Sequence, residues 1–479
     1  AHDVTSGGTT SEDVGDIDFK SLVEINASSV TIDTSDGSGG TVDFDSTINS
    51  TGDNGALTIS SGGGAVAIDA AIGGEANDHL DGLTINASGT GAITVAAIGD
   101  DTEKGVDGGN VAIGNDTTTL VTLSGADYHA NGSITVKATS ATGGNQGENI
   151  KFTAGALTEV KTVDDDINFL TGVIYLSDGN DLTVKSNGGA ITINSIMGEA
   201  EKDADVILNA DAGVDTTGEN VTVGAIGSGN EIAAVTIAGR DGITLKGNIT
   251  LSNKAGSDLD IDGAVTIDGS VTIDTDNESA DRGSGATEND GDINFSSTIN
   301  GNSTANSVDN LTIEAGDTTA AGSPTLTLSG AIGGSSPLDT LSINASTSTM
   351  AFSVPQIGSG TAAGAGSSTA SVSIGNANSG DITFSTTNSA GNGSISYIFG
   401  GNTTITSGGG ADGFKIGAGD TTFKNTGSTK SISFATGGFT LGNDADLKIE
   451  TNNGAISVGD IIGTAGGSAT DVILSLIHI

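Results

Sequence analysis

Short runs of alternating apolar and polar residues, each ended by a turn-forming residue, recur along the whole chain. Typical runs are VTID at 30–33, LTIS at 57–60, LTIN at 83–86 and ITIN at 191–194. In an extended strand, a period of two places Val, Leu and Ile on one face and Thr, Ser and Asp on the other. Because Gly, Asn or Asp interrupts each longer window, no helix is expected. The chain is therefore predicted to be all-β.

A much longer repeat overlies these short runs. Four matched pairs define it, namely VTIDT at 30–34 and 271–275, LTINAS at 83–88 and LSINAS at 341–346, VAIGN at 111–115 and VSIGN at 372–376, and NGGAI at 187–191 and NNGAI at 452–456. The order is kept while the offset rises from 271 − 30 = 241 to 452 − 187 = 265. Surface loops tolerate insertion and stacked strands do not, so loops of unequal length between conserved strands would produce this drift.

The repeat predicts how the chain is organised. Residues 1–29 would end a preceding repeat, residues 30–270 would form the first copy, and residues 271–474 would form a truncated second copy. The residues at 475–479 read SLIHI, and we interpret them as a translated sequencing adapter rather than a natural apolar terminus. The first residues contain neither an initiator Met nor a signal peptide, so we expect an internal or processed piece of a longer protein.

Stacked coils are the fold that this pattern favours. Two or three strands would make one coil of about twenty to thirty residues. Parallel crossovers are right-handed by default, so we predict a right-handed parallel β-helix, elongated, with variable Gly/Ser/Asp-rich loops. Coils about 4.8 Å apart would give a rod of roughly 80–110 Å. A hexapeptide period at 261–274 favours the left-handed alternative. A tandem immunoglobulin-like sandwich would need a buried Trp, and the chain has none.

Composition limits the partners and the chemistry. The formal net charge is −45, which repels nucleic acid and anionic lipid. The chain has no Cys, so it has neither disulfides nor Cys-ligated metals. No apolar run is long enough to span a membrane, so no membrane insertion of this segment is expected. The apolar residues are mostly Ala, Val and Ile, which suit a narrow core between stacked strands.

Several segments of the second copy resemble the repeats of filamentous-haemagglutinin-like and autotransporter-like giant bacterial surface adhesins. The resemblance rests on GDINFSSTIN at 291–300, LTIEA at 311–315, LTLSGAIGG at 326–334 and LDTLSINA at 338–345, and the pattern runs to about Leu474. It implies a right-handed β-helix that serves as the stalk of a secreted or surface-anchored adhesin, outside the cell or on its surface. Flanking repeats of the same polypeptide would be its neighbours. Its receptor, whether a host, cell-surface or glycan ligand, stays unidentified.

Catalysis is not expected from the sequence. His2 and His478 lie at the chain ends, and His79 and His129 fall in segments that read as loops without a catalytic motif. The alternative function is a carbohydrate-active β-helix enzyme, a polysaccharide lyase or hydrolase, whose site would combine clustered Asp with Arg or Lys. The Asp run at 164–166 could supply carboxylates, but the second copy has no equivalent. No cofactor is predicted to be required.

Calcium is the one ligand that a local motif suggests. The segment GGEANDHLDG at 73–82 resembles a calcium-binding nonapeptide, with Asn77, Asp78 and Asp81 as candidate ligands. A Gly-rich turn is the alternative interpretation, because Ala76 replaces a Gly of the motif and the motif is not in tandem. Asp258, Asp260 and Asp262 alternate along one strand, which is typical of a solvated acidic face.

Three structural expectations follow. Seven Ile residues should face the core, namely Ile32, Ile59, Ile85, Ile193, Ile273, Ile313 and Ile343. The segments at 83–88 and 341–346, and those at 71–74 and 331–334, should occupy equivalent places, with length differences confined to loops such as 276–290 and 358–370. No polar cap follows Leu474, so the last coil should expose apolar edges.

Overall fold

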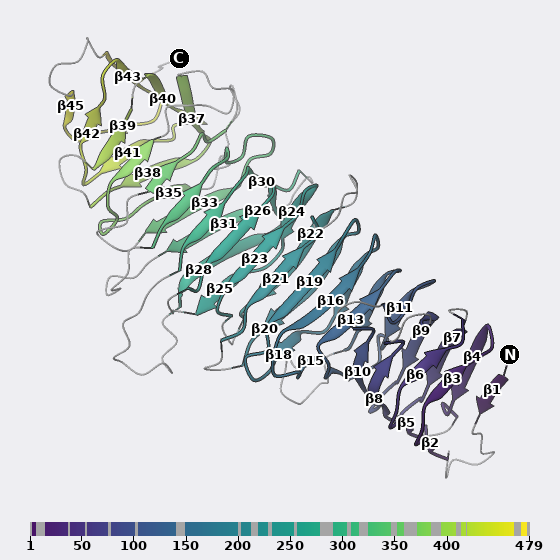
Figure 1. The fold of residues 1–479 in the computed structure, drawn as a ribbon. Helices are drawn as coiled ribbons and strands as arrows, with labels where there is room; N and C mark the ends of the chain where they lie inside the picture. Colours follow the sequence, from purple (N-terminus) through teal and green to yellow (C-terminus); the bar gives the residue numbers. More distant parts are fainter. Residues whose placement is uncertain are drawn as a thin grey trace. The chain divides into compact units, whose positions relative to one another are not determined.

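A computed structural model gives the fold for most of the chain (Figure 1). It describes residues 2–5, 15–36, 39–52, 55–74, 78–100, 104–139, 149–199, 203–211, 219–228, 232–252, 256–277, 291–303, 308–315, 324–345, 352–358, 371–384, 394–408, 413–417, 419–463 and 471–476. The chain divides into two compact units. Unit 1 comprises Ala1–Ile232 with Ile237–Asp241, and unit 2 comprises Ala233–Thr236 with Gly242–Ile479.

Every element of the described residues is a β-strand, which confirms the all-β prediction. The first half of the chain contains β1 (His2–Thr5), β2 (Ile17–Phe19), β3 (Val23–Ile25), β4 (Ser29–Asp33), β5 (Val42–Phe44), β6 (Ile48–Ser50), β7 (Gly55–Ser60), β8 (Val66–Ile72), β9 (Leu80–Asn86), β10 (Ala92–Ile98), β11 (Val111–Ile113), β12 (Leu120–Leu123), β13 (Asp127–Ala130), β14 (Ile134–Lys137), β15 (Ile150–Phe152), β16 (Thr158–Thr162), β17 (Ile167–Thr171), β18 (Ile174–Leu176), β19 (Leu182–Ser186), β20 (Ile191–Met197), β21 (Val206–Asn209), β22 (Asn220–Ile226) and β23 (Val235–Ala238).

The second half contains β24 (Gly242–Leu245), β25 (Ile249–Ser252), β26 (Leu259–Asp262), β27 (Val265–Ile267), β28 (Ser270–Asn277), β29 (Ile293–Phe295), β30 (Ile299–Gly301), β31 (Asn310–Ala315), β32 (Leu326–Leu328), β33 (Thr340–Ala345), β34 (Phe352–Val354), β35 (Ser371–Ile374), β36 (Ile382–Phe384), β37 (Ser394–Phe399), β38 (Asn402–Thr406), β39 (Phe414–Ile416), β40 (Gly419–Ser428), β41 (Ile432–Ala435), β42 (Phe439–Leu441), β43 (Ala445–Asn452), β44 (Ile456–Ser457), β45 (Ile461–Gly463) and β46 (Val472–Leu476).

Strands pair with strands of the next coil rather than with their neighbours in sequence. In unit 1, one ladder runs β4–β7–β9–β11–β14–β17–β20, and its first four strands follow one another in Figure 1. A second runs β2–β5–β8–β10–β12–β15–β18, and a third includes β13–β16–β19–β21. All of these pairings are parallel, so the predicted parallel β-solenoid is confirmed.

The core is a column of apolar side chains inside these ladders. All seven Ile residues predicted to face inward are at most 2% exposed. Strand β7 alternates between buried and half-buried residues along its whole length, so Thr58 lies outside between buried Leu57 and Ile59. The register inferred from the alternation is therefore confirmed. At about 0.8 kcal/mol per buried methylene, this repeated burial is the main favourable contribution to folding.

The two copies of the long repeat have the same internal pairing. Leu83 pairs with Val111 in unit 1, and Leu341 pairs with Val372 in unit 2. In unit 2 the ladder β28–β31–β33–β35–β38–β41, whose strands follow one another in Figure 1, repeats the order of β4–β7–β9–β11–β14–β17. The expected equivalence of 83–88 and 341–346 is thus confirmed for their described strands. Of the predicted loops at 276–290 and 358–370, residues 276–277 belong instead to β28, because the strand continues to Asn277, and Gly358 has a left-handed φ of 82°. Residues 278–290 and 359–370 lie outside the described residues.

The turns at 71–74 and 331–334 also match. Gly73 and Gly333 have φ values of 62° and 65°, a left-handed conformation that favours Gly. Gly73 N donates to Ile48 O at 2.9 Å, and Gly333 N donates to Ile299 O at 2.6 Å. The same turn therefore follows the same coil step in both copies.

One ladder of unit 2 is interrupted where its counterpart in unit 1 is continuous. Strands β26, β29 and β32 pair in order, but β32 and β34 do not, and pairing resumes from β34 through β36, β39, β42 and β45. In this ladder the residue after each strand donates to the preceding coil, as Ser329 N does to Phe295 O at 3.0 Å. By the same register, the residue after β34 would donate its backbone N–H to the carbonyl of Leu328. That residue is Pro355, which has no N–H.

The last described coil exposes apolar residues, as expected. Val472 and Leu474 in β46 are 43% and 51% exposed. Their counterparts in the first copy, Val206 and Leu208 in β21, are 0% exposed. Each pair of counterparts holds the same register, because Val206 pairs with Leu182 and Val472 pairs with Leu447. Strand β46 includes Ser475, the first residue of the segment interpreted as adapter-derived.

Candidate ionic sites

The residues predicted to bind calcium divide between described and undescribed parts of the chain. Asn77 lies outside the described residues. Asp78 precedes β9, and its Oδ2 accepts a hydrogen bond from Asn49 Nδ2 at 3.1 Å. Asp81 lies exposed within β9, beside Gly108, where an added Cβ would stand 1.8 Å from Asp81 Oδ1. Asp78 thus accepts a hydrogen bond from the Asn49 side-chain amide of the preceding coil. Asp81 lies next to Gly108, which has no side chain.

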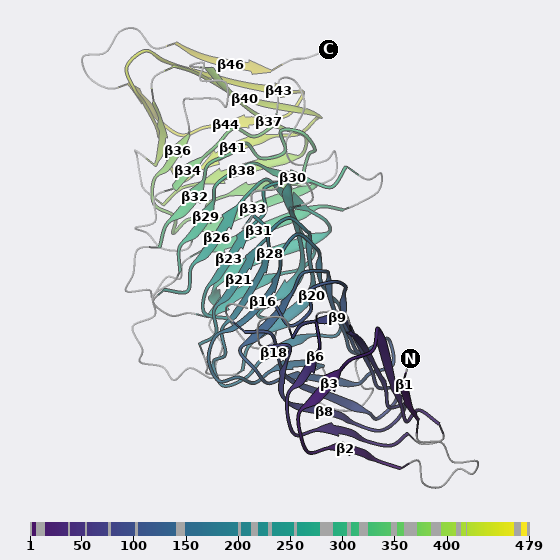
Figure 2. The same ribbon diagram turned by 45° about the vertical axis from the view of Figure 1, so that its right-hand side comes forward.

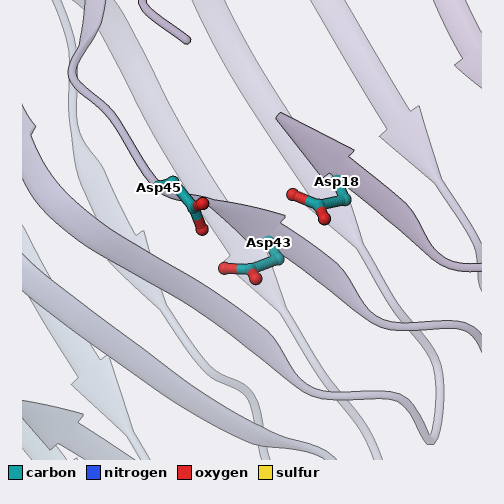
Figure 3. Close-up of side chains that lie close together, drawn as sticks. All are labelled: Asp18, Asp43 and Asp45. Atoms are coloured by element: carbon teal, nitrogen blue, oxygen red, sulfur yellow. The ribbon is translucent and has the colours of Figure 1, made fainter. Parts of the chain in front are cut away.

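A different group of carboxylates comes together on the outer face of unit 1. Asp18 in β2 pairs in register with Asp43 in β5, and Asp45 follows β5 (Figure 3). One oxygen of each carboxylate lies within 4.8 Å of the others, and no other group of this kind is found among the described residues. Lys20 Nζ lies 2.7 Å from Asp18 Oδ2 and 2.9 Å from Asp45 Oδ2. An ammonium group therefore already provides a positive charge at this cluster.

Asp43 differs electrostatically from its neighbours. Its Oδ1 is buried and has no hydrogen-bond partner. Desolvation raises the pKa of Asp43 first, Asp45 raises it further, and Lys20 acts in the opposite direction. The arrangement can attract a cation through its unbalanced carboxylates, but its exposed members also lie in contact with water.

In the second copy, neutral side chains that donate hydrogen bonds to carboxylates replace this cluster. By register, Asp260 and Asp262 take the places of Asp18 and Lys20, while Asn294 and Ser296 replace Asp43 and Asp45. Asn294 Nδ2 donates to Asp260 Oδ1 at 3.2 Å, and Ser296 Oγ donates to Asp262 Oδ1 at 2.7 Å. Of the alternating Asp residues predicted to form a solvated acidic face, Asp260 and Asp262 are exposed and Asp258 is half-buried. All three accept hydrogen bonds from the next coil, Asp258 from Asp292 N at 2.9 Å.

Several carboxylates accept hydrogen bonds from the backbone of the next coil, a structural role that was not predicted from the sequence. Asp181 Oδ1 accepts the backbone N–H of Asp205 at 2.9 Å, and Asp446 Oδ1 accepts that of Asp471 at 2.9 Å. Asp166 Oδ1, from the Asp run at 164–166, accepts Ala190 N at 2.8 Å. In each case the side chain satisfies a donor at the start of the next coil. Asp166 and Asp181 each stand one residue before a strand, which was the available signal, whereas Asp446 is the second residue of β43.

A buried histidine corrects one sequence interpretation. His129 is not in an exposed loop, because it lies in β13 and is only 5% exposed. Its Nε2 lies 3.2 Å from Glu159 Oε2 in β16, and Lys185 Nζ in β19 lies 2.8 Å from Glu159 Oε1. The hydrogen bond with His129 is the largest cause that lowers the pKa of Glu159, to about 2, with Lys185 adding to it. The alternation in β13 was too short to separate strand from loop.

The other three histidines are far apart in the sequence. His79, which was also predicted to lie in an exposed loop, is buried at 9% exposure. His2 lies in β1, and His478 is outside the described residues.

A second buried charge lies near the end of unit 1. Glu219 is 0% exposed, and its Oε2 lies 3.2 Å from Arg240 Nε. Arg240 also reaches Asp211 Oδ1 at 2.8 Å through a terminal nitrogen. The planar guanidinium can hold two carboxylates at once, which an ammonium group cannot do in the same geometry. This group is therefore a structural clamp between residues that flank an undescribed segment.

The chain matches no known protein family, no curated protein and no solved structure. Among the described residues, the structure contains no helix of the length and hydropathy needed to cross a membrane.

Proposed function

We propose that this chain is the structural stalk of a secreted or surface-anchored bacterial adhesin, which mediates attachment to cells or surfaces. The observation that carries the proposal is the repeated pairing order of the two copies, with Leu83–Val111 and Leu341–Val372 at the same step. A fold built from repeating coils grows by adding coils without redesigning its core. Such a fold is well suited to extending a chain away from a surface. It is less suited to building a single catalytic centre.

The surface chemistry is consistent with this proposal. Net charge of −45 keeps such chains apart from one another and from nucleic acid. Carboxylates such as Asp181 and Asp446 bond the next coil, so part of the acidity belongs to the architecture. An extracellular or cell-surface location is part of the proposal.

The enzyme alternative has less support. A polysaccharide lyase or hydrolase needs a set of carboxylates and a base in one site. The cluster of Asp18, Asp43 and Asp45 holds Lys20, but its counterpart has Asn294 and Ser296. Because only one of the two copies has the cluster, the shared architecture does not depend on it. Enzymatic activity is therefore not part of the proposal.

Surface display tests the stalk proposal. The chain would be fused to an outer-membrane anchor in a bacterium that neither aggregates nor adheres, with the anchor alone as control. Val42→Asp, which puts a charge into a fully buried position, is the folding control. We expect the displayed chain to increase attachment to surfaces, and Val42→Asp to lose that gain. Equal attachment with the anchor alone, despite a folded and displayed chain, would contradict the proposal.

A further inference from the structure

A groove of about 310 Å³ opens on unit 2 beside the interrupted ladder. The strands that contribute to it, β32, β34 and β36, follow one another along one side of this unit (Figure 2). Its lining residues are Thr325, Leu326, Thr327, Leu328, Phe352, Ser353 and Thr383. The volume lies at the lower end of the range typical of small-molecule sites, about 300–1,000 Å³.

The groove lies where the ladder of paired strands is interrupted. In the first copy, Val66 pairs with Ile93 and Ile68 pairs with Val95, so β8 and β10 form a continuous ladder. In the second copy, β32 and β34 form no such pair. Pro355 cannot donate the hydrogen bond that would close the step. The break is therefore a local departure from a pattern that the same chain otherwise repeats.

Burial shows that the break opens the core slightly to the outside. Leu326 and Leu328 are 5% and 7% exposed. Their counterparts Val66 and Ile68 are 1% and 0% exposed. The apolar floor of the groove is thus accessible from the surface, which is where a ligand would approach.

The lining chemistry restricts the class of ligand. Hydroxyl groups of Thr325, Thr327, Ser353 and Thr383 surround an apolar floor that includes Phe352. Among the described residues, no ionisable side chain lines the groove, and Lys415, which pairs with Thr383, is bonded to Asp381. The chain as a whole carries a charge of −45. A charged ligand would lose its hydration in the groove without gaining a partner of opposite charge. A ligand with hydroxyl groups at its rim and C–H groups on its face satisfies both parts of the lining.

We propose that this groove binds a neutral sugar unit. The hydroxyl groups of Ser353 and Thr383, which pair in register on β34 and β36, exchange hydrogen bonds with the hydroxyls of the sugar. The apolar floor contacts its C–H face. This inference goes beyond the proposed function, which names no ligand and assigns no binding site.

Saturation-transfer NMR and calorimetry on the full chain test the site. The probes are methyl glucoside, methyl galactoside, N-acetylglucosamine and cellobiose, with glucuronic acid as the charged comparison. The site variant combines Ser353→Ala with Thr383→Val. The matched control combines Thr94→Val with Thr122→Val, which pair at the corresponding step of the continuous ladder. We expect at least one neutral sugar to bind, with a loss of about tenfold or more in the site variant and none in the control.

Three outcomes would overturn the inference. The first is that no neutral probe binds at millimolar concentration. The second is that glucuronic acid binds as tightly as the neutral sugars. The third is that the control variant loses as much affinity as the site variant, since that would place binding elsewhere. Circular dichroism of both variants excludes unfolding as the cause of a loss. None of these outcomes bears on the stalk proposal, which is tested by surface attachment.

Discussion

Tyr128 and Tyr397 make the same hydrogen bond in the two units. The Tyr128 phenol donates to the carbonyl of Val95 at 2.8 Å, and the Tyr397 phenol donates to that of Val354 at 2.9 Å. The tyrosines are 397 − 128 = 269 residues apart, whereas their acceptors are 354 − 95 = 259 residues apart. Ten more residues in one copy thus leave the contact unchanged. Both rings are at most 1% exposed, so the hydroxyl groups need these partners.

Removing either phenol oxygen should weaken the unit that contains it. Tyr128→Phe and Tyr397→Phe each leave a buried carbonyl with one partner fewer, at an expected cost of about 0.5–1.5 kcal/mol. Hydrogen exchange followed by mass spectrometry should show faster exchange around Val95 in the first variant and around Val354 in the second. Tyr175→Phe is the control, because that ring is only half-buried. Equal changes in both units from one substitution would contradict the assignment.

Acid should weaken unit 1 through Glu159. The folded pKa of about 2 lies below the ordinary value of 4.5, because His129 and Lys185 stabilise the carboxylate. The contribution is therefore present above about pH 4.5 and is lost as the pH falls toward 2. Glu159→Gln should lower stability at neutral pH by about 1–3 kcal/mol and flatten the acid dependence of unfolding. Glu24→Gln, at an exposed position, is the control. An unchanged acid profile in Glu159→Gln would contradict this account.

The ion pairs that Arg240 forms with Glu219 and Asp211 should stabilise unit 1 by more than a surface ion pair does. Arg240→Ala would leave Glu219 as a buried carboxylate without this cation, at an expected cost of about 1–3 kcal/mol. Combining Arg240→Met with Glu219→Leu removes both charges and should recover much of the loss. Chemical denaturation of unit 1 measures the difference. If the double substitution is as damaging as Arg240→Ala, charge pairing is not the cause.

The same substitution should have different effects at two matched leucines. Leu208→Ala removes a fully buried side chain and should cost about 2–5 kcal/mol. Leu474→Ala changes a side chain that is 51% exposed and should cost less than about 1 kcal/mol. Thermal unfolding of the two variants compares them directly. Similar losses would mean that Leu474 is covered in solution.

The fold was largely predictable because its signal is repeated. Alternation with a period of two placed Ile59 and Ile313 inside, and both are fully buried. The drift in repeat offset separated strands from loops, because strands cannot gain a residue without reversing their faces. Short strands were harder: β13 holds His129 in four residues, too few for alternation to identify.

The ionic groups were less predictable than the strands. The cluster of Asp18, Asp43 and Asp45 depends on which residues of successive coils stand opposite one another. A local sequence motif does not reveal which residues of successive coils pair. The calcium-like motif that includes Asn77 could be recognised because its residues are consecutive in the sequence. The interruption of the ladder at Pro355 could not be predicted from the sequence either. Pro355 has this effect only because its backbone nitrogen stands where the register requires a hydrogen-bond donor.

Disulfide trapping tests the central claim, which is that both copies stack in the same register. The chain has no Cys, so introduced pairs report without background. Thr58 and Thr84 pair in unit 1, and Thr312 and Ser342 pair in unit 2. Paired residues of stacked strands lie about 4.8 Å apart, within reach of a disulfide, whereas a shift of two residues exceeds about 7 Å.

Four double variants make the comparison. Thr58→Cys with Thr84→Cys, and Thr312→Cys with Ser342→Cys, are the stacked pairs. Thr58→Cys with Asn86→Cys, and Thr312→Cys with Asn344→Cys, are the controls shifted by two residues on the same face. The measurement is the extent of disulfide formation under mild oxidation of the folded chain. The account predicts efficient formation in both stacked pairs and little in either control. Efficient formation in a shifted control, or failure of one stacked pair only, would contradict a register shared by the two copies.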